Sequence, residues 1–361
     1  MRPALDARTV NNHYPGIGRY TFELARALTG LTNLTLLVNP LQVSQEFDVW
    51  SLRARRIAVP YPPRSLPQQW VVPARLRRAQ VDVYHSPYYL MPYAPGLPAV
   101  VTAHDLIPLY IGDLSSAHKA MLVAAHRLAF HAARKIIAVS EWTRADFIEK
   151  FHLPPDKVVA IPHGVAPEFR PPAPEALAGF RRQWELPRDY LLTVGINKPH
   201  KNLPRLIQAY AALPAGAPPL VVAGPEDARY PEVRAAASGL GRRVMFIGRV
   251  AEAQLPLLYA GATLFVQPSL MEGFGLPVVE AMACGTPVAC ADAPGLTEAA
   301  GGAARLFNPH EIESIVHALV NALGDSALRA GLRARGLRRA RELTWTRTAE
   351  ATLKVYHEAL A

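Results

Sequence analysis

Residues 269–292, SLMEGFGLPVVEAMACGTPVACAD, follow a short apolar run and contain a glycine-rich turn that leads into a helix. Glu272 lies in the turn, and Glu280 lies on the helix that begins near Gly275. Pro277 falls in the first helical turn, where a backbone N–H has no partner within the helix. This order of strand, glycine turn and helix predicts a loop at the carboxyl edge of a parallel sheet.

The predicted start of this helix is a candidate anion site. The backbone amides of Phe274, Gly275 and Leu276 would be its unpaired donors, and together with the helix dipole they suit a diphosphate. A carboxylate next to a phosphate needs another partner, so we expect Glu272 to face sugar hydroxyls or developing positive charge. We expect Glu280 to accept hydrogen bonds from a ribose diol. The alternative is a capped helix with two ordinary exposed carboxylates.

Short apolar runs alternate with helical stretches on both sides of this motif, which indicates parallel βαβ units. The pattern pauses where seven prolines fall within residues 154–174, and we place an inter-domain linker there. We predict an α/β protein with two doubly wound, Rossmann-like domains that face each other across a cleft. The predicted strands lie in residues 4–8, 34–38, 81–86, 99–105, 135–140, 190–195, 220–224, 244–248, 262–269 and 287–291. The predicted domains are 1–165 and 166–345, with a helix over 346–361 that packs back on the first domain.

Composition excludes several classes of protein. The chain has 361 residues, of which 50% are hydrophobic and 19% charged, so it is not a largely disordered protein. It shows neither a signal-peptide pattern nor an apolar run long enough to span a membrane, and we expect a cytoplasmic protein. Cys284 and Cys290 have no partners for a zinc site, and we expect both to be buried, reduced thiols.

The positive charge is concentrated in the first half of the chain. Residues 1–165 carry 18 basic and 11 acidic residues, whereas the whole chain has a net charge of +10. A solvated basic face is the favoured interpretation, and peripheral contact with an anionic membrane at its inner face is the alternative. Pro60–Pro73 is predicted to be a loop. Nucleic acid is excluded as a partner, because the chain lacks a basic stripe with stacking aromatics. The basic face named above consists of Arg53, Arg55, Arg56, Arg64, Arg75, Arg77 and Arg78, interspersed with Trp50, Tyr61 and Trp70.

Basic residues also follow the predicted strand 190–195. Gly195 ends this strand, and Lys198, His200 and Lys201 lie on the next turn. Ligands of doubly wound folds bind at this sheet edge, where a lysine can neutralise a diphosphate. We expect this role of Lys201, because Asn202 begins a helix that can orient it, and we interpret Lys198 as a solvated turn lysine.

Two features of the first half could contact a ligand. Gly16 and Gly18 lie in a turn before a helix and permit close approach of the backbone. Thr21 occupies the third glycine position of a dinucleotide fingerprint, so NAD is not expected. His104 and Asp105 follow an apolar strand, at the carboxyl edge of its predicted sheet.

Together, PGIGRY, THD, AVSEWTRADF, IPHGV and the motifs around Lys201 and Glu272 resemble the retaining GT-B glycosyltransferases of the glycosyl transferases group 1 family. The resemblance implies a nucleotide-sugar donor in the C-terminal domain and an acceptor in the N-terminal domain. It implies transfer with retention, without a metal ion or cofactor. The chain departs from the family at Ile196 and His200, one of which is an arginine in many members, so phosphate neutralisation would rest on Lys201 with Lys198 or His200 assisting.

The resemblance also assigns roles to single residues. No dedicated protein base is implied, because the leaving phosphate takes the acceptor proton, and Glu272 is not assumed to be a nucleophile. The implied contacts are Glu272 and His104 with the transferred sugar, Glu280 with the ribose, Lys201 with the diphosphate, and Gly16 and Gly18 with the donor phosphates from the opposite domain.

Among relatives, the combination of PGIGRY and THDLIP is most similar to bacterial mannosyltransferases that build surface polysaccharides. The expected reaction moves a hexosyl group, with mannosyl favoured, from GDP-mannose or a UDP-sugar to a glycan or lipid-linked acceptor. The two domains are expected to close over the donor. A sugar-nucleotide epimerase of the same fold and a non-catalytic nucleotide-sugar-binding subunit are the alternatives.

Overall fold

The computed structural model describes residues 1–11, 13, 15–42, 44, 46–112 and 114–361. It divides into two compact units. Unit 1 consists of Met1–Leu109, Asp113–Gly164 and Thr344–Ala361, and unit 2 consists of Tyr110–Gly112 and Val165–Leu343. Apart from the short segment Tyr110–Gly112, the chain passes from unit 1 to unit 2 after Gly164, within the proline-rich segment, and returns after Leu343.

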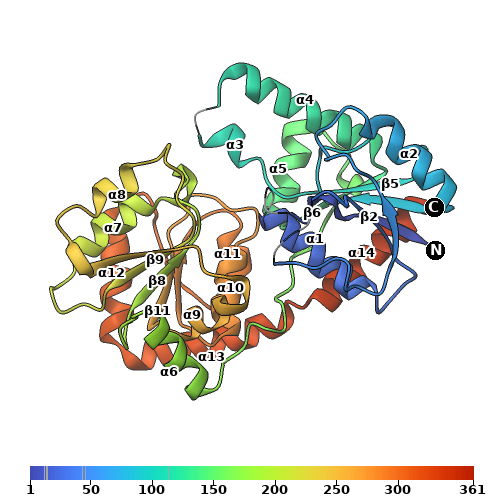
Figure 1. The fold of residues 1–361 in the computed structure, drawn as a ribbon. Coiled ribbons are helices and arrows are strands. Elements are labelled where there is room, and N and C mark those ends of the chain that lie inside the picture. The colour runs from blue at the N-terminus through green and yellow to red at the C-terminus, as the bar shows by residue number, and fades with distance from the viewer. Residues whose placement is uncertain (12, 14, 43, 45, 113) are drawn as a thin grey trace. The chain divides into compact units, whose positions relative to one another are not determined.

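Unit 1 is built on a parallel sheet, to which the labelled strands β2, β5 and β6 belong (Figure 1). Over the described residues, this sheet has seven strands in the order β3-β2-β1-β4-β5-β6-β7. The order reverses between β1 and β4, as in doubly wound folds. The strands are β1 (Pro3–Asp6), β2 (Thr35–Val38), β3 (Arg55–Ala58), β4 (Val83–Ser86), β5 (Ala99–Ala103), β6 (Lys135–Ala138) and β7 (Val158–Ala160). The helices are α1 (Pro15–Leu28), α2 (Gln68–Ala79), α3 (Ile107–Tyr110), α4 (Ser116–Ala132), α5 (Glu141–Phe151) and α14 (Trp345–Leu360), with 3-10 turns η1 (Ala7–Thr9) and η2 (Pro155–Lys157).

Unit 2 repeats this plan with a parallel sheet that, in the part of the chain described, has six strands in the order β10-β9-β8-β11-β12-β13. Its order reverses between β8 and β11. The strands are β8 (Leu191–Val194), β9 (Leu220–Ala223), β10 (Val244–Gly248), β11 (Leu264–Gln267), β12 (Val288–Ala291) and β13 (Arg305–Phe307). The helices are α6 (Pro174–Gln183), α7 (Leu203–Ala211), α8 (Glu232–Ala236), α9 (Leu255–Gly261), α10 (Leu276–Ala283), α11 (Leu296–Ala300), α12 (Ile312–Gly324) and α13 (Ser326–Glu342), with 3-10 turns η3 (Pro199–Lys201), η4 (Gly241–Arg243) and η5 (Glu252–Gln254).

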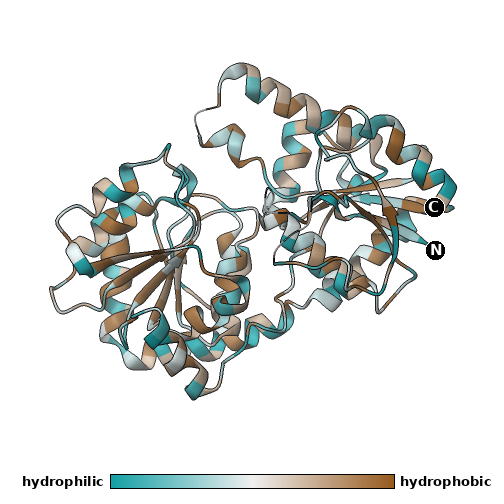
Figure 2. Cartoon of the chain, in the orientation of Figure 1, coloured by the Kyte–Doolittle hydropathy of each residue, from teal (hydrophilic) through white to brown (hydrophobic). Residues whose placement is uncertain are grey.

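The predicted fold class is confirmed, and so is each predicted strand. Every residue of the central strands β1, β4 and β5 is buried, and the strands of both sheets are largely hydrophobic (Figure 2). The three strands that the sequence analysis missed are β3, β7 and β13, all at sheet edges. Edge strands pair on one side only, and β3 and β13 contain arginine and exposed residues, whereas β7 was missed although it is apolar, because it has only three residues.

The prediction of a loop over Pro60–Pro73 is wrong for its last residues. Helix α2 begins at Gln68 and continues through Pro73 to Ala79. Proline removes one helical hydrogen bond, but Pro73 lies on the buried face of this helix together with Val72 and Leu76. Burial of that face in the core of unit 1 offsets the missing bond.

Helix α14 packs within unit 1, against α1 and strands β4, β5 and β6. Its Tyr356 hydroxyl lies 2.7 Å from His85 Nδ1, and His85 Nε2 lies 2.8 Å from the Thr102 hydroxyl. The Thr102 hydroxyl is in turn 3.0 Å from that of Tyr20 on α1. This buried chain of hydrogen bonds joins α14 to the sheet, and burial lowers the pKa of His85 to about 3.

Two further sequence expectations concern cysteines and membrane spans. Cys284 and Cys290 are free and buried, as predicted. In the ranges that the structure describes, no helix is both long enough and apolar enough to cross a membrane.

The buried His126 should make the stability of unit 1 sensitive to acid. Its ring stacks on Tyr89 at 4.0 Å between centroids, and burial lowers its pKa from 6.5 to about 4. Because the unfolded chain takes up this proton first, stability falls as pH decreases from 6.5 towards 4, by about 2 kcal/mol at about pH 5. His126→Phe should remove this part of the loss, as measured by urea unfolding near pH 7 and near pH 5. His131→Phe, at an exposed position of the same helix, should retain it.

Candidate active site

The loops that carry the predicted donor-binding residues follow β8 and β11. These two strands are neighbours at the point where the strand order of unit 2 reverses. In doubly wound sheets, ligands bind at the carboxyl ends of the strands at such a point. The two loops are also joined directly, since the Leu270 amide donates to the His200 carbonyl at 2.8 Å.

Lys201 and Glu272 form an ion pair at this edge. Lys201 Nζ lies 2.6 Å from Glu272 Oε1, and both side chains are largely buried. The same oxygen accepts a hydrogen bond from the Ser269 hydroxyl at 2.6 Å and one from Gln267 Nε2 at 3.0 Å. The structure thus brings two residues predicted to contact the donor into direct contact with each other.

The surroundings keep Glu272 ionised. Burial by itself raises the pKa of this carboxyl, but the charge of Lys201, the nearby His200 and the hydrogen bonds from Lys201 and Ser269 outweigh it, so the pKa lies below its usual value. A carboxylate in this state accepts hydrogen bonds and does not donate a proton. It suits contact with sugar hydroxyls.

The other predicted residues of the loop that carries Lys201 differ from one another in burial and in contacts. His200 is half-buried, and burial, followed by the positive charge of Lys201, lowers its pKa to about 4, so it is neutral near pH 7. Lys198 is exposed at the start of η3. A Cβ on Gly195 would lie 3.5 Å from Lys201 Cε, so the lysine stem passes along this glycine. Asn202 begins α7, as expected, and its Nδ2 donates to the carbonyls of Pro268 and Pro309.

Helix α10 begins as the sequence predicts. Gly275 precedes it with a φ of 101°, and Pro277 lies in its first turn. Phe274 is buried, and Leu276 is the first helical residue. A Cβ on Gly275 would lie 2.8 Å from Leu296 Cδ2, so helix α11 packs closely against this turn. Binding of an anion by the amides of residues 274–276 stays a prediction.

Glu280 is almost completely buried within α10. Its Oε2 accepts a hydrogen bond from the Tyr259 hydroxyl at 3.0 Å. Contact of this carboxylate with a ribose stays a prediction.

Gly16, Gly18 and His104 belong to unit 1. Gly16 lies at the start of α1, and a Cβ there would have no atom of another segment within 4 Å. Packing explains why residue 18 is a glycine, because a Cβ there would lie 2.9 Å from the Thr9 carbonyl oxygen of η1. Residues 12 and 14 of the preceding loop lie outside the described residues. Contact of both glycines with a donor stays a prediction.

His104 follows β5 and has a defined tautomer. Its Nε2 lies 3.1 Å from the Pro87 carbonyl, which can only accept, so Nε2 carries the proton. Burial lowers its pKa to about 4, and its ring meets Tyr20 edge-on at 4.9 Å. Near pH 7, Nδ1 therefore offers a lone pair that can accept a hydrogen bond.

Four residues that support Glu272 were not predicted from the sequence. Gln267, at the end of an apolar strand, and Ser269, three positions before Glu272, were detectable as polar residues beside the motif. Gly295 and Pro294 have no such signal. The Glu272 amide donates to the Pro294 carbonyl at 3.1 Å, and a Cβ on Gly295 would lie 2.2 Å from the Glu272 carbonyl oxygen.

Gly295→Ala should therefore displace the turn that carries Glu272. Gly302 is a matched control, because the two glycines have φ values of 77° and 76° but only Gly295 is crowded. Gly302→Ala should cost about 1–2 kcal/mol of stability from backbone strain alone. Gly295→Ala should cost about 1–3 kcal/mol more and should also reduce activity. Thermal unfolding of both variants checks the difference, and equal costs would contradict the packing argument.

Comparison with known proteins places the chain in a family. Residues 180–339 match the model described as glycosyl transferases group 1, and residues 14–169 match that of glycosyltransferase family 4. The O-antigen chain mannosyltransferase B of Escherichia coli is 31% identical over 294 residues, which cover 78% of this chain and 75% of that protein. The chain belongs to the glycosyl transferases group 1 family.

This chain covers a smaller share of two other similar proteins. The serotype-specific mannosyltransferase WbdA of Escherichia coli is 32% identical over 275 residues, which cover 72% of this chain but only 33% of that longer protein. D-inositol 3-phosphate glycosyltransferase of Salinispora tropica is 32% identical over 311 residues, covering 78% of this chain and 64% of that protein.

Solved structures share the fold of the family. HepE of Anabaena, in complex with UDP-glucose, matches with a TM-score of 0.81 at 18% identity, over 99% of this chain and 100% of that one. WaaG, a glycosyltransferase involved in lipopolysaccharide biosynthesis, matches with a TM-score of 0.76 at 20% identity, over 99% of both chains. These matches confirm the predicted GT-B fold class.

Proposed function

We propose that the protein is a retaining hexosyltransferase that moves a mannosyl group from a nucleotide sugar to a glycan or lipid-linked acceptor in surface polysaccharide synthesis. The observation that carries this proposal is the Lys201–Glu272 pair at the switch point of unit 2. The mannosyltransferase relatives favour mannose as the transferred sugar, and the UDP-glucose complex of HepE supports a nucleotide-sugar donor.

In the proposed reaction, Lys201 and Glu272 contact two different parts of the donor. Lys201 turns to the diphosphate and offsets its charge, and Glu272, still held by Ser269 and Gln267, accepts from sugar hydroxyls. The bond between the anomeric carbon and the phosphate oxygen breaks. The acceptor oxygen bonds to the anomeric carbon on the same face, and its proton passes to the leaving phosphate.

The remaining predicted residues bind and orient the donor. Glu280 accepts from the ribose diol, and the amides of residues 274–276 face the diphosphate. Gly16 and Gly18 bring backbone to the phosphates. His104, neutral with its proton on Nε2, accepts a sugar hydroxyl at Nδ1. The proposed mechanism uses no metal ion, so transfer should be unaffected by EDTA.

Peripheral contact with an anionic membrane is part of this proposal. On and next to α2, Leu66 and Trp70 are 76% and 70% exposed, and the exposed arginines Arg64, Arg75 and Arg78 lie nearby in sequence. Exposed apolar side chains next to arginines suit the headgroup region of a bilayer. Trp70→Ser should weaken flotation with vesicles that contain anionic lipid.

One assay separates this function from its alternatives. The protein is incubated with GDP-mannose, and separately with UDP-glucose, each with and without a mannose-terminated oligosaccharide. Acceptor-dependent release of the nucleoside diphosphate, with an α-linked product in the proton NMR spectrum, supports retaining transfer. An epimerised sugar nucleotide without acceptor supports the epimerase, and saturable donor binding without any product supports the non-catalytic subunit.

A further inference from the structure

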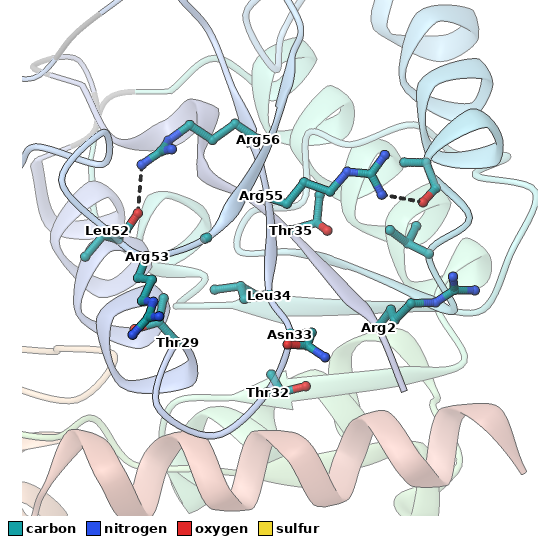
Figure 3. A pocket seen from close by; sticks show the side chains of 13 residues that line it. Arg2, Thr29, Thr32, Asn33, Leu34, Thr35, Leu52, Arg53, Arg55 and Arg56 are labelled. Carbon is teal, nitrogen blue, oxygen red and sulfur yellow. Dashed lines mark hydrogen bonds between the residues drawn. The ribbon is translucent and has the colours of Figure 1, made fainter.

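Unit 1 contains a large pocket at the amino edge of its sheet, away from the edge that carries His104. The pocket has a volume of about 740 Å³. Arg2 directly precedes β1, Thr35 begins β2 and Arg55 begins β3, and all three line it (Figure 3). His104 follows β5 at the carboxyl edge, where doubly wound folds bind their ligands, so this amino-edge pocket is a separate feature.

The amino-edge pocket is strongly basic. Arg2, Arg53, Arg55 and Arg56 line it, and its described lining contains no aspartate or glutamate. Arg2 is neutralised, because its Nη2 lies 3.2 Å from Oδ1 of Asp82. Within the described ranges no salt bridge involves the other three arginines. Three positive charges therefore surround one pocket without a compensating carboxylate.

Neutral groups hold two of these guanidinium groups in place. Arg55 Nη1 donates to the Ala79 carbonyl at 2.9 Å, and Arg56 Nη2 donates to the Leu52 carbonyl at 2.7 Å (Figure 3). The Arg56 guanidinium also lies over the Trp50 ring, 5.5 Å from its centroid. Carbonyls and an aromatic ring position a guanidinium without cancelling its charge, and each guanidinium keeps N–H groups for a ligand.

One donor in this arrangement is left without a partner. Arg56 Nε is buried and makes no hydrogen bond among the residues that the structure describes. A buried donor without a partner is unfavourable, as is the approach of several like charges. The repulsion between the arginines is relieved by an oxyanion, which accepts from guanidinium groups with suitable geometry, whereas the buried Nε is closed to a ligand in the pocket.

We propose that the amino-edge pocket binds the phosphate group of a phosphorylated ligand. Its volume lies within the usual range for small-molecule sites and exceeds the needs of a lone phosphate. The half-buried Thr32 and the exposed Asn33, which also line the pocket, are available to hydrogen-bond the rest of such a ligand. The same chemistry fits a soluble phosphorylated compound or the headgroup of a phospholipid. The site is independent of the proposed transfer reaction.

Pyrophosphate binding, measured by calorimetry, tests the proposal. The measurements use Lys201→Ala as the background, so that binding of pyrophosphate at the predicted donor site is weakened. Pyrophosphate should bind saturably, and more weakly at higher salt concentration. The double variant R53E/R55E should bind at least about tenfold more weakly. Arg53→Ser, which removes no contact that the structure shows for Arg53, keeps the test valid if the double variant does not fold.

A matched variant with two charge reversals elsewhere in unit 1 completes the test. K119E/R127E changes two basic residues on α4, away from the pocket, and should bind pyrophosphate like the background protein. Absence of saturable binding, or equal loss in R53E/R55E and K119E/R127E, would overturn the proposal.

Vesicles distinguish the two sources of the phosphate. Flotation is measured with phosphatidylcholine vesicles alone and with added phosphatidic acid. The ligand is a lipid headgroup if R53E/R55E binds neither pyrophosphate nor anionic vesicles while K119E/R127E binds both. If R53E/R55E loses pyrophosphate only, the ligand is a soluble phosphorylated compound.

Discussion

Replacing Glu272 with alanine should lower the rate of sugar transfer by about a hundredfold to a thousandfold, the effect of removing a preorganised charged group from an active site. One oxygen of this carboxylate is held by Lys201, Ser269 and Gln267, so its orientation is fixed before a donor binds. In the proposed reaction, loss of the carboxylate removes both the acceptor for sugar hydroxyls and the negative charge near the anomeric carbon as the phosphate leaves. Steady-state kinetics with GDP-mannose and an oligosaccharide acceptor measure the change.

One further variant shows whether the charge or the shape of Glu272 matters, and a second variant is its control. Glu272→Gln keeps the shape but removes the charge, and it should lose nearly as much activity as the alanine variant. Glu232→Gln removes a carboxylate at an exposed position of unit 2 and should leave transfer unchanged. If Glu272→Ala transfers sugar at the wild-type rate, the proposed role of this residue is wrong.

Replacing Lys201 with methionine should weaken nucleoside diphosphate binding by about tenfold to a hundredfold, the range expected for a lost hydrogen bond to a charged group. Methionine keeps most of the apolar stem that passes Gly195 and removes the ammonium group. Calorimetric titration with GDP and UDP measures the loss. Arg242→Met removes a positive charge from an exposed turn of unit 2 and should not affect the affinity. Unchanged affinity of Lys201→Met would exclude its proposed contact with the diphosphate.

The difference in stability between the wild type and Lys201→Met should depend on pH. Because the pKa of Glu272 is lowered in the folded protein, its ionised form stabilises the fold above the ordinary value of 4.5, and this contribution is lost as pH falls through the folded pKa. Without Lys201 the pKa of Glu272 is higher, because burial raises it and the charge of Lys201 no longer opposes this. The wild type should therefore exceed Lys201→Met in stability most clearly near neutral pH, and the difference should narrow below 4.5. Urea unfolding over this range measures the difference, and a constant gap would contradict the coupling.

The candidate site could be predicted from the sequence in part only. The glycines and proline of residues 273–277 determine a local turn and a helix start, and both were correctly placed. The resemblance placed Lys201 and Glu272 at one donor site, but their ion pair could not be foreseen, since the two residues are 71 positions apart and their direct contact depends on the tertiary structure. The crowding of Gly295 against Glu272 has the same origin, because it depends on where the loop after β12 lies.

The sequence by itself determined the α/β class, the central strands and the position of the glycine turn, because buried parallel strands and helix starts carry local patterns of apolar residues, glycine and proline. Only the tertiary structure decided the order of the strands, the edge strands, the course of α2 through Pro73 and the pairing of Lys201 with Glu272. These features depend on contacts between distant segments. Burial against the rest of the fold overrides local preference there, and strand order brings the chemistry of two loops together at one edge.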